Sequence, residues 1–457
     1  MSLTSISFIG IYLPLLLIAY YNPFFKNNTF RKIILFCASL GLYAFTEPVY
    51  VLLLLVMILY NYGLVKLADK TGKRLFRGIA ITLDASVLLF FKYINVFLSF
   101  AFINDSVSSI AFPVGLSYFT FKAISYVVES KDEKNGNFVD MAIYISNFLT
   151  IVSGPLSTYK EELPFIREKK SVLGDNTLYK GAERFILGLG KKVIIADSLG
   201  VLVTTCFSSS EPSVVMSWAG AIAYTLQLFF DFSGYTDMAI GAGYWFGFNL
   251  PENFNYPYMA ASISDFWKRW HISLTKWFTK YIYFPLGGSR VKTVGRHIFN
   301  LFVVWLVTGM WHGSSITFII WAMIYFVLQL IEKYTKWREI LQKLRIGHVY
   351  TLFVVIIEWV IFKSASLSEA AFYIKSMFGF NGNAIGSEYD IASILKYIIP
   401  FVLGTAFSTN VGVQIKKIAT KNTFTNLVYN SFLILIFVVC IILTAGKGYS
   451  APLYAEF

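Results

Sequence analysis

The stretch that begins with Asp265-Phe-Trp-Lys-Arg-Trp-His271 and ends with Trp311-His312-Gly313 decides how this chain folds. One of the four histidines of the sequence ends the first motif, and a second lies in the last one. Residues 265–296 carry seven Lys or Arg and a single acid, and an apolar run at 298–310 then leads directly to His312. The stretch predicts a basic surface segment that enters a membrane segment with an ionisable group at its far end. Such a group is costly in hydrocarbon, so it is a functional candidate.

Low charge and repeated apolar runs predict an all-α polytopic membrane protein. Of the 457 residues, 56% are hydrophobic and 14% are charged, whereas a soluble domain has about 25% charged residues. The apolar runs occupy residues 6–21, 33–47, 48–65, 78–101, 109–128, 138–158, 193–208, 214–232, 298–312, 315–331, 349–363, 391–409 and 427–445. Several are shorter than the ~20 residues of a standard spanning helix. We therefore expect tilted, half-spanning or protein-surrounded helices rather than a simple bundle.

The net charge of +13 indicates membrane orientation rather than nucleic-acid binding. The basic residues lie in short segments between apolar runs, as the positive-inside rule expects of cytoplasmic loops. Placing these segments in the cytoplasm predicts that the N-terminus and the C-terminus are both extracytoplasmic. The three cysteines lie far apart in the sequence, so neither a metal site nor a disulfide framework is expected.

Two apolar segments, 109–128 and 138–158, break the alternation of spans that the basic loops require. Each contains helix breakers, Pro113-Val-Gly115 in the first and Ser153-Gly154-Pro155 in the second. One of the two segments must therefore be re-entrant or lateral, and the sequence does not decide which. Because irregular backbone at membrane depth is tolerated only where it is buried in protein or lines a cavity, this pattern favours a protein-lined interior.

Residues 159–192 and 250–296 are too polar to span and too long for simple turns. The second segment mixes aromatic and basic side chains in a way that suits helices lying in the membrane interface. No internal repeat or separate soluble module is evident, so residues 1–457 are expected to form a single integral membrane domain.

His312 and His271 are the candidate catalytic residues. Imidazole titrates near neutral pH, so His312 could act as a general base that takes a proton from a hydroxyl group. Trp311 and Gly313 flank it, and Gly313 permits close approach of a substrate or of another chain segment. His271 could contact a donor that enters from the cytosol, or act as a second acid or base. The alternative for each histidine is a purely structural role.

Two carboxylates, Asp231 and Asp237, lie in an apolar run on either side of Gly234 and Tyr235. Being six residues apart, they do not share a face of a continuous helix, and Gly234 could break that helix. Buried charges need partners, so a structural ion pair with Lys268 or Arg269 is the expected role, ahead of direct catalysis.

Several stretches together resemble the membrane-bound O-acyltransferase family, and within it the membrane subunits of alginate and other cell-surface polysaccharide O-acetylation systems. They are Phe112–Phe121, Ser153–Pro155, Gly190–Asp197, Asp231–Gly241, Pro251–Phe254, Phe266–Leu274, Pro285–Arg290 and Trp311–Gly313. The resemblance covers about residues 5–445. It implies a ring of transmembrane helices, with re-entrant and interfacial helices, around a thin central region. It also implies that His312 matches the catalytic histidine of the family and His271 the second histidine of the acetylation branch.

The expected function is O-acetyl transfer in a bacterial plasma membrane. The donor would be a cytoplasmic thioester, with acetyl-CoA as the expected one, and no cofactor or metal would be bound. The acceptor would be a hydroxyl on an extracytoplasmic polysaccharide or on a partner acetyltransferase. Lys268 and Arg269 are expected to attract the donor phosphates, and Trp267 and Trp270 to stack on its adenine. Simple anchoring to the inner face is the alternative role for the two cations.

Two other functions remain open from the sequence. One is D-alanyl transfer to teichoic acid from a carrier-protein thioester, and the other is a transporter or channel without covalent chemistry. The sequence leaves undecided the acceptor, the donor, the oligomeric state and whether an acyl-enzyme intermediate forms.

Overall fold

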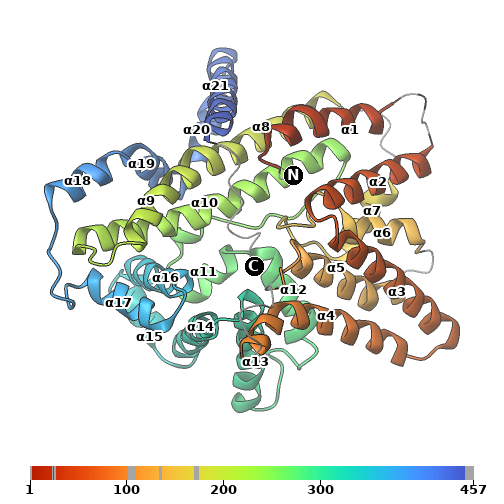
Figure 1. Cartoon of the computed structure of the whole chain (residues 1–457), viewed down its shortest axis with the longest axis horizontal. Helices are drawn as coiled ribbons and strands as arrows, with labels where there is room; N and C mark the ends of the chain where they lie inside the picture. The colour runs from red at the N-terminus through yellow and green to blue at the C-terminus, as the bar shows by residue number, and fades with distance from the viewer. Residues whose placement is uncertain are drawn as a thin grey trace. The chain divides into compact units, whose positions relative to one another are not determined.

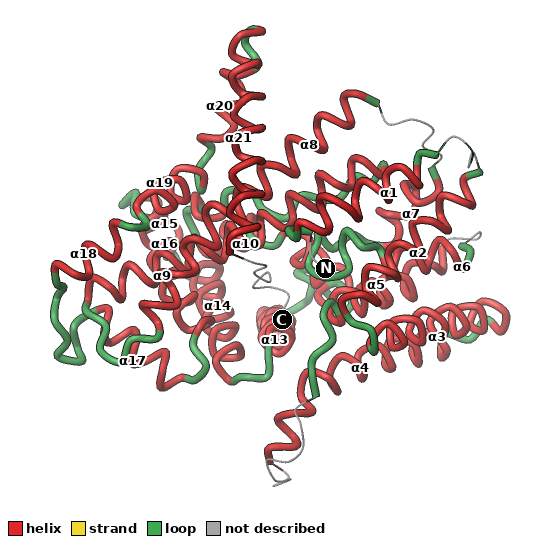
Figure 2. Tube along the Cα trace, turned by 45° about the horizontal axis from the view of Figure 1, so that its top comes forward, coloured by secondary structure: helices red, strands yellow, loops and turns green. Residues whose placement is uncertain are grey.

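The computed structural model describes residues 3–22, 24, 27–100, 110–132, 136–168 and 174–447. Within these ranges the chain is built from helices, joined by loops and without a strand (Figures 1 and 2). Residues 448–457, which carry the predicted extracytoplasmic C-terminus, lie outside the described ranges. The all-α prediction is confirmed for the described residues.

Seven helices of the described chain are long and apolar enough to cross a membrane. They are α2 (Asn28–Thr46), α3 (Tyr50–Thr71), α4 (Leu75–Phe100), α10 (Val214–Phe246), α13 (Val294–His312), α14 (Ile316–Tyr334) and α21 (Thr423–Lys447). The bent pair α18 (Glu388–Leu395) and α19 (Ile398–Phe407), with a 60° bend, makes an eighth if it is one span. This confirms a polytopic membrane protein, whereas its orientation in the membrane stays a prediction.

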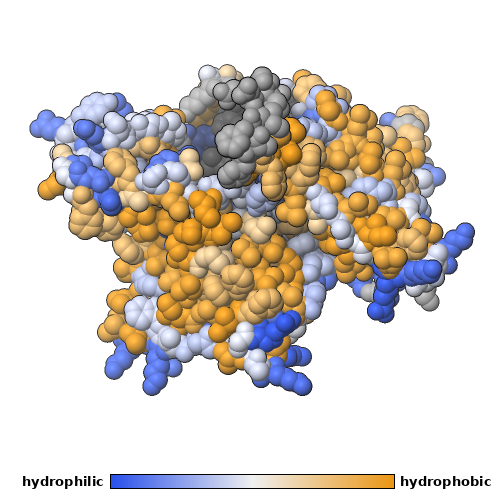
Figure 3. All heavy atoms as spheres, turned by 60° about the horizontal axis from the view of Figure 1, so that its bottom comes forward, coloured by the Kyte–Doolittle hydropathy of each residue, from blue (hydrophilic) through white to orange (hydrophobic). Residues whose placement is uncertain are grey.

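The apolar helices present much of their surface to the outside of the protein. Only 6% of the most apolar stretch of α4 and 11% of that of α21 is buried. Figure 3 shows broad apolar areas on its visible face, with hydrophilic side chains gathered near the edges. Soluble monomers rarely expose contiguous apolar surface of this kind, so these helices are suited to contact with lipid.

The backbone divides into two compact units. The first comprises Met1–Ile186, Tyr235–Pro251 and Thr444–Phe457, and the second comprises Leu187–Gly234 and Glu252–Leu443. Whether the two units act as the single integral domain expected from the sequence stays a prediction. Helix α10 and helix α8 (Asp175–Gly190) each contribute residues to both units.

The first unit begins with a short π-helical turn and holds seven further α-helices before α8. Its elements, besides α2–α4, are η1 (Phe8–Tyr12), α1 (Leu13–Tyr20), α5 (Leu116–Glu129), η2 (Ser130–Asp132), α6 (Phe138–Ser146) and α7 (Tyr159–Arg167). Helices α5 and α6 have 14 and 9 residues, so both fall short of the ~20 residues of a full span. The buried segment 147–158 that follows α6 is not helical.

The glycines of the two helix-breaking motifs, Gly115 and Gly154, lie where the backbone leaves no room for a side chain. Gly115 has a φ of +79°, and a Cβ atom there would lie 2.3 Å from the backbone oxygen of Ile151. A Cβ atom at Gly154 would lie 2.4 Å from the backbone oxygen of Leu149. Only glycine therefore lets the Pro113–Gly115 turn pack against the irregular segment.

A buried ion pair gives several polar side chains of this irregular segment a hydrogen-bond partner. The Lys122 ammonium donates to a Glu162 carboxylate oxygen at 3.0 Å and to the Thr150 hydroxyl at 2.6 Å. The Asn147 amide and the Ser157 hydroxyl donate to the same carboxylate at 2.6 and 2.5 Å. Buried irregular backbone is tolerated when its polar groups are satisfied inside the protein, and this network contributes partners for Asn147, Thr150 and Ser157.

The second unit carries the motifs that decided the fold. Besides α10, α13, α14, α18, α19 and residues 423–443 of α21, it contains η3 (Lys191–Ala196), α9 (Asp197–Phe207), η4 (Pro257–Met259), α11 (Ile263–Arg269), α12 (Ile272–Phe278), η5 (Thr279–Tyr283), α15 (Trp337–Lys343), α16 (Gly347–Lys363), α17 (Leu367–Met377) and α20 (Val411–Ala419). The basic segment 250–296 is thus a chain of very short helices. Helices α13 and α14 pack closely at Gly309, because glycine has no side chain. A Cβ atom at this position would lie only 2.9 Å from the backbone oxygen of Phe318.

Candidate active site

His312 is the last residue of α13 and is enclosed by aromatic rings. Its side chain is buried, with a residue exposure of 4%. Its ring centroid lies 4.6 Å from that of Trp311, 5.0 Å from that of Trp321 and 5.2 Å from that of Phe362. These contacts come from α13, α14 and α16, so three helices fix the position of one imidazole.

Gly313, which follows His312, leaves space for a further aromatic ring, that of Phe318. A Cβ atom at this position would lie 2.3 Å from the ring of Phe318. The ring of Phe318 in turn lies 6.4 Å from that of His312, centroid to centroid. The close approach that the sequence predicted at Gly313 is therefore made by Phe318 in this structure.

His271 sits in an unusual backbone conformation between α11 and α12. It has a φ of 45° and a ψ of 52°, and it is 2% exposed. A residue other than glycine held in this left-handed region costs on the order of 1–3 kcal/mol, and such strain clusters at functional sites. The loop before α11 holds it there, because Asn253 O accepts from the backbone N–H of Ile272 at 2.9 Å.

The side chain of Asn253 fixes the tautomer of His271. Asn253 Oδ1 accepts from the backbone N–H of Ser273 at 3.1 Å, and from the Ser273 hydroxyl at 2.8 Å. A backbone N–H can only donate, so this atom is the amide oxygen. His271 Nδ1, at 3.1 Å from the same oxygen, must therefore carry the proton.

The neutral form of His271 consequently has its lone pair on Nε2. Burial lowers the pKa of His271 to about 3, because a charged imidazolium would be poorly solvated there. His271 is thus neutral across the physiological pH range. It can accept a hydrogen bond or a proton at Nε2, but it does not hold a proton there for release.

The structure brings the two histidines together around Trp311. The ring centroid of Trp311 lies 6.2 Å from that of His271 and 4.6 Å from that of His312. Phe232 of α10 packs edge-on against the other side of His271, at 4.7 Å between centroids. One indole therefore separates the two candidate catalytic groups.

The two tryptophans predicted to stack on a donor are largely covered by protein. Trp270 is 1% exposed, and its ring packs against Trp359 at 5.0 Å and Phe254 at 5.1 Å. The Trp267 ring packs against Tyr325 at 5.0 Å and Trp305 at 5.1 Å. Their stacking on a donor stays a prediction, and it would require these aromatic neighbours to move.

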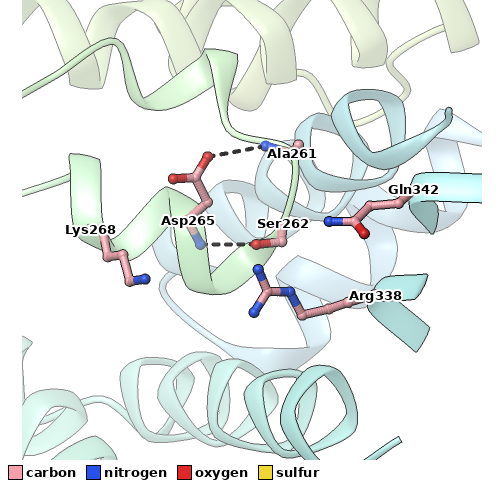
Figure 4. Close-up of a pocket in the computed structure, with 6 residues that line it drawn as sticks. All are labelled: Ala261, Ser262, Asp265, Lys268, Arg338 and Gln342. Carbon is pink, nitrogen blue, oxygen red and sulfur yellow. Dashed lines mark hydrogen bonds between the residues drawn. The ribbon is translucent and has the colours of Figure 1, made fainter. Parts of the chain in front are cut away.

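The two predicted donor-binding cations differ in their surroundings. The Arg269 guanidinium pairs with the Asp265 carboxylate of the preceding helical turn at 3.0 Å. Lys268 instead is exposed and lines a cavity beside Arg338 (Figure 4). The sequence analysis did not single out Arg338, because nothing in the sequence shows that α15 lies beside α11.

The prediction of the ion-pair partner of Asp231 was wrong. Asp231 is buried, and its carboxylate pairs with the Lys192 ammonium at 2.6 Å rather than with Lys268 or Arg269. Lys192 also pairs with Asp197 at 2.6 Å. The structural ion-pair role expected for Asp231 is present, but its cation comes from η3.

Asp237 also pairs with a cation of an earlier helix. Arg184 of α8 contacts the Asp237 carboxylate at 2.6 Å, again in place of the expected partner. Gly234 does not break α10, which continues through it to Phe246. A Cβ atom at Gly234 would lie 2.7 Å from the backbone oxygen of Gly188, so this glycine permits close packing. Tyr235 is buried on the same helix, and its supporting role stays a prediction.

Within the described ranges, no group of three or more His, Cys, Asp or Glu side chains is placed to hold a metal ion. The site groups are therefore two imidazoles, an amide, aromatic rings and nearby cations. This set can accept a proton from a hydroxyl and can bind an anion.

These features define a class, a helical membrane protein with two buried histidines beside one tryptophan. The sequence model of the membrane-bound O-acyltransferase family matches residues 40–368, and the chain belongs to this family. It is therefore an O-acyltransferase. This identification does not support the alternative of a transporter or channel without covalent chemistry.

Relatives named for three different activities are similar to this chain. The probable alginate O-acetylase AlgI of Pseudomonas putida is 31% identical, over 98% of this chain and 99% of the relative. The peptidoglycan O-acetyltransferase of Helicobacter pylori is 33% identical, over 82% of this chain and 79% of the relative. The teichoic acid D-alanyltransferase of Bacillus subtilis is 30% identical, but over 50% of this chain and 60% of the relative.

Proposed function

We propose that this protein transfers an acetyl group from a cytoplasmic thioester, acetyl-CoA in the simplest case, to a hydroxyl outside a bacterial plasma membrane. The acceptor is a cell-surface polysaccharide or a partner acetyltransferase that passes the group on. The observation that carries the proposal is the pair His271 and His312, held one indole apart at the end of a membrane-spanning helix. The acetylases that match most of the chain support the acetyl group.

In the proposed reaction, His312 accepts the proton of the acceptor hydroxyl. The oxygen attacks the thioester carbonyl, a C–O bond forms and the C–S bond breaks. The proton then passes from His312 to the departing thiolate, so that the thiol and the new ester are the products. The aromatic walls around His312 exclude water, which would otherwise hydrolyse the thioester.

His271 acts in this proposal as a neutral acceptor at Nε2. Its lone pair is available to hold a hydrogen-bond donor of the substrates, or to take a proton in passing. Because a pKa of about 3 keeps it neutral, it does not serve as the resting acid. Asn253 is then a positioning residue, which selects the tautomer with the lone pair on Nε2.

Replacing Asn253 with alanine is expected to lower acetyl transfer by about 5- to 100-fold, because losing the partner of a buried polar group costs roughly 1–3 kcal/mol. Asn253→Asp keeps an acceptor for Nδ1 and should recover part of the activity. Its carboxylate would also raise the pKa of His271, so the acid limb of the pH–rate profile should move to higher pH. The measurement is the initial rate of transfer against pH in isolated membranes.

Asn255→Ala is the matched control, because Asn255 lies in the same loop but is exposed. This variant should keep the full rate and the unshifted profile. Equal rates for Asn253→Ala and Asn255→Ala at equal protein abundance would remove Asn253 from the site.

The acetyl group and the D-alanyl group are distinguished by analysing the cell surface. Cells without the gene should lack ester-linked acetate that mild base releases, and the restored gene should return it. Loss of ester-linked D-alanine with unchanged acetate would replace this proposal with the teichoic acid reaction. Acetylation is favoured here because the acetylase relatives align with 82% or more of the chain, whereas the B. subtilis D-alanyltransferase aligns with 50%.

A further inference from the structure

A small polar cavity lies between α11 and α15 in the second unit. Its volume is about 150 Å³, and its lining residues are Ala261, Ser262, Asp265, Lys268, Arg338 and Gln342. Figure 4 shows α11 with Lys268 on one side and α15 with Arg338 and Gln342 on the other. The cavity therefore joins two segments that are far apart in the sequence.

The two cations at this cavity carry charge that no acid neutralises. No salt bridge joins Lys268 or Arg338 to a carboxylate in the part of the chain that the structure describes. The one acid at the cavity, Asp265, is paired with Arg269 and also accepts from the backbone N–H of Ala261 at 3.4 Å. The cavity thus presents two positive charges, together with the amide of Gln342.

The helix that carries Lys268 is held firmly beside the segment that carries Arg338. The Glu332 carboxylate accepts from the backbone N–H of Ile263 at 2.6 Å and from that of Ser264 at 2.9 Å. These bonds join the start of α11 to the end of α14, from which the chain leads directly into α15. These bonds therefore hold the backbone that carries Lys268 beside the segment that leads to Arg338.

We propose that Lys268, Arg338 and Gln342 form a subsite for a phosphate group. A guanidinium presents a planar set of donors that matches phosphate oxygens, and an ammonium adds a compact charge. Lys268 is three residues before His271, so their Cα atoms are at most about 11 Å apart along the chain. The backbone that carries Lys268 therefore lies near His271. Naming the donor as its source rests on the proposed function.

Two sources supply this chemistry, the phosphates of a coenzyme A thioester and the head group of an anionic lipid. Purified full-length protein in neutral detergent should bind coenzyme A about ten-fold more weakly after Lys268→Gln or Arg338→Gln, as expected for a charge-assisted hydrogen bond. Added salt should reduce this difference, because both side chains are exposed. Pantetheine, which has no phosphate, should bind the wild type and the variants equally.

Lys343→Gln is the matched control, because Lys343 is exposed on the same helix but does not line the cavity. It should leave coenzyme A binding unchanged. Selective loss of binding to phosphatidylglycerol over phosphatidylcholine vesicles, with coenzyme A binding intact, would support the subsite and assign it to lipid. Unchanged binding of both probes by the double variant would overturn the subsite. That result would leave the acyl transfer at His312 standing, because neither binding assay measures it.

Discussion

His312→Asn is expected to lower ester-linked acetate on the cell surface by at least about 100-fold while the protein inserts in normal amount. Loss of a general base costs typically 10²–10⁴-fold. Asparagine keeps approximate size and a hydrogen-bonding group within the walls of Trp311, Trp321 and Phe362, but it cannot accept a proton near neutral pH. The measurement is base-released acetate per unit of membrane protein.

The exposed residue His348 provides the control for this variant. His348 is exposed at the start of α16, so His348→Asn should acetylate as the wild type does. His271→Asn separates two roles. A loss as large as that of His312→Asn assigns acid–base work to His271, and a smaller loss assigns substrate contact. Full acetylation by His312→Asn at normal abundance would contradict the mechanism.

Lys122→Met is expected to cause the largest loss of stability among single substitutions in the first unit. The change leaves the Glu162 carboxylate buried without its cation, and breaking a buried ion pair in this way costs about 3–5 kcal/mol. Hydrogen bonds from Asn147 and Ser157 do not replace the missing charge. The midpoint of thermal unfolding in detergent is the measurement.

The double variant Lys122→Met with Glu162→Gln should recover much of this loss, because it removes both charges together. Lys131→Met changes an exposed lysine of the same unit and should leave the midpoint unchanged. An unfolding midpoint for Lys122→Met that equals that of Lys131→Met would show that the buried network does not stabilise the irregular segment.

The sequence predicted the features that depend on periodicity and local chemistry. Long apolar runs identified α13, α14 and most of the other spanning helices, because hydrocarbon demands length and apolarity from each segment by itself. The breakers near Gly115 and Gly154 located the irregular backbone for the same local reason. His312 was singled out because an ionisable group at the end of an apolar run is rare, and His271 because its motif resembles that of the acyltransferase family.

The features that were missed depend on which segments lie side by side. Asp231 was expected to pair with a cation of the motif at 265–271, but Lys192 reaches it because Gly234 allows α10 to pack closely on the end of α8 and the start of η3. Asn253 lies in a stretch that resembles the family, but its contact with His271 was not predicted, since that contact depends on the left-handed backbone at His271. Arg338 likewise gains a role only once α15 lies beside α11.

The pattern of aromatic and basic residues in Trp267–Trp270 illustrates a further limit. Alternation with cations suggested rings available to a ligand, but Trp270 is enclosed by other aromatic rings and Arg269 is occupied by Asp265. The direction of side chains on a seven-residue helix depends on its neighbours, and no periodic signal is long enough to reveal it.

The most direct test of acyl transfer across the membrane uses inverted membrane vesicles, whose cytoplasmic face is outside and whose native acceptors are inside. Acetyl-CoA labelled in its acetyl group is added outside, and base-labile label on the enclosed acceptors is counted. Wild-type vesicles should accumulate label, while right-side-out vesicles and inverted His312→Asn vesicles should not. Equal labelling of the wild-type and His312→Asn inverted vesicles would contradict the account.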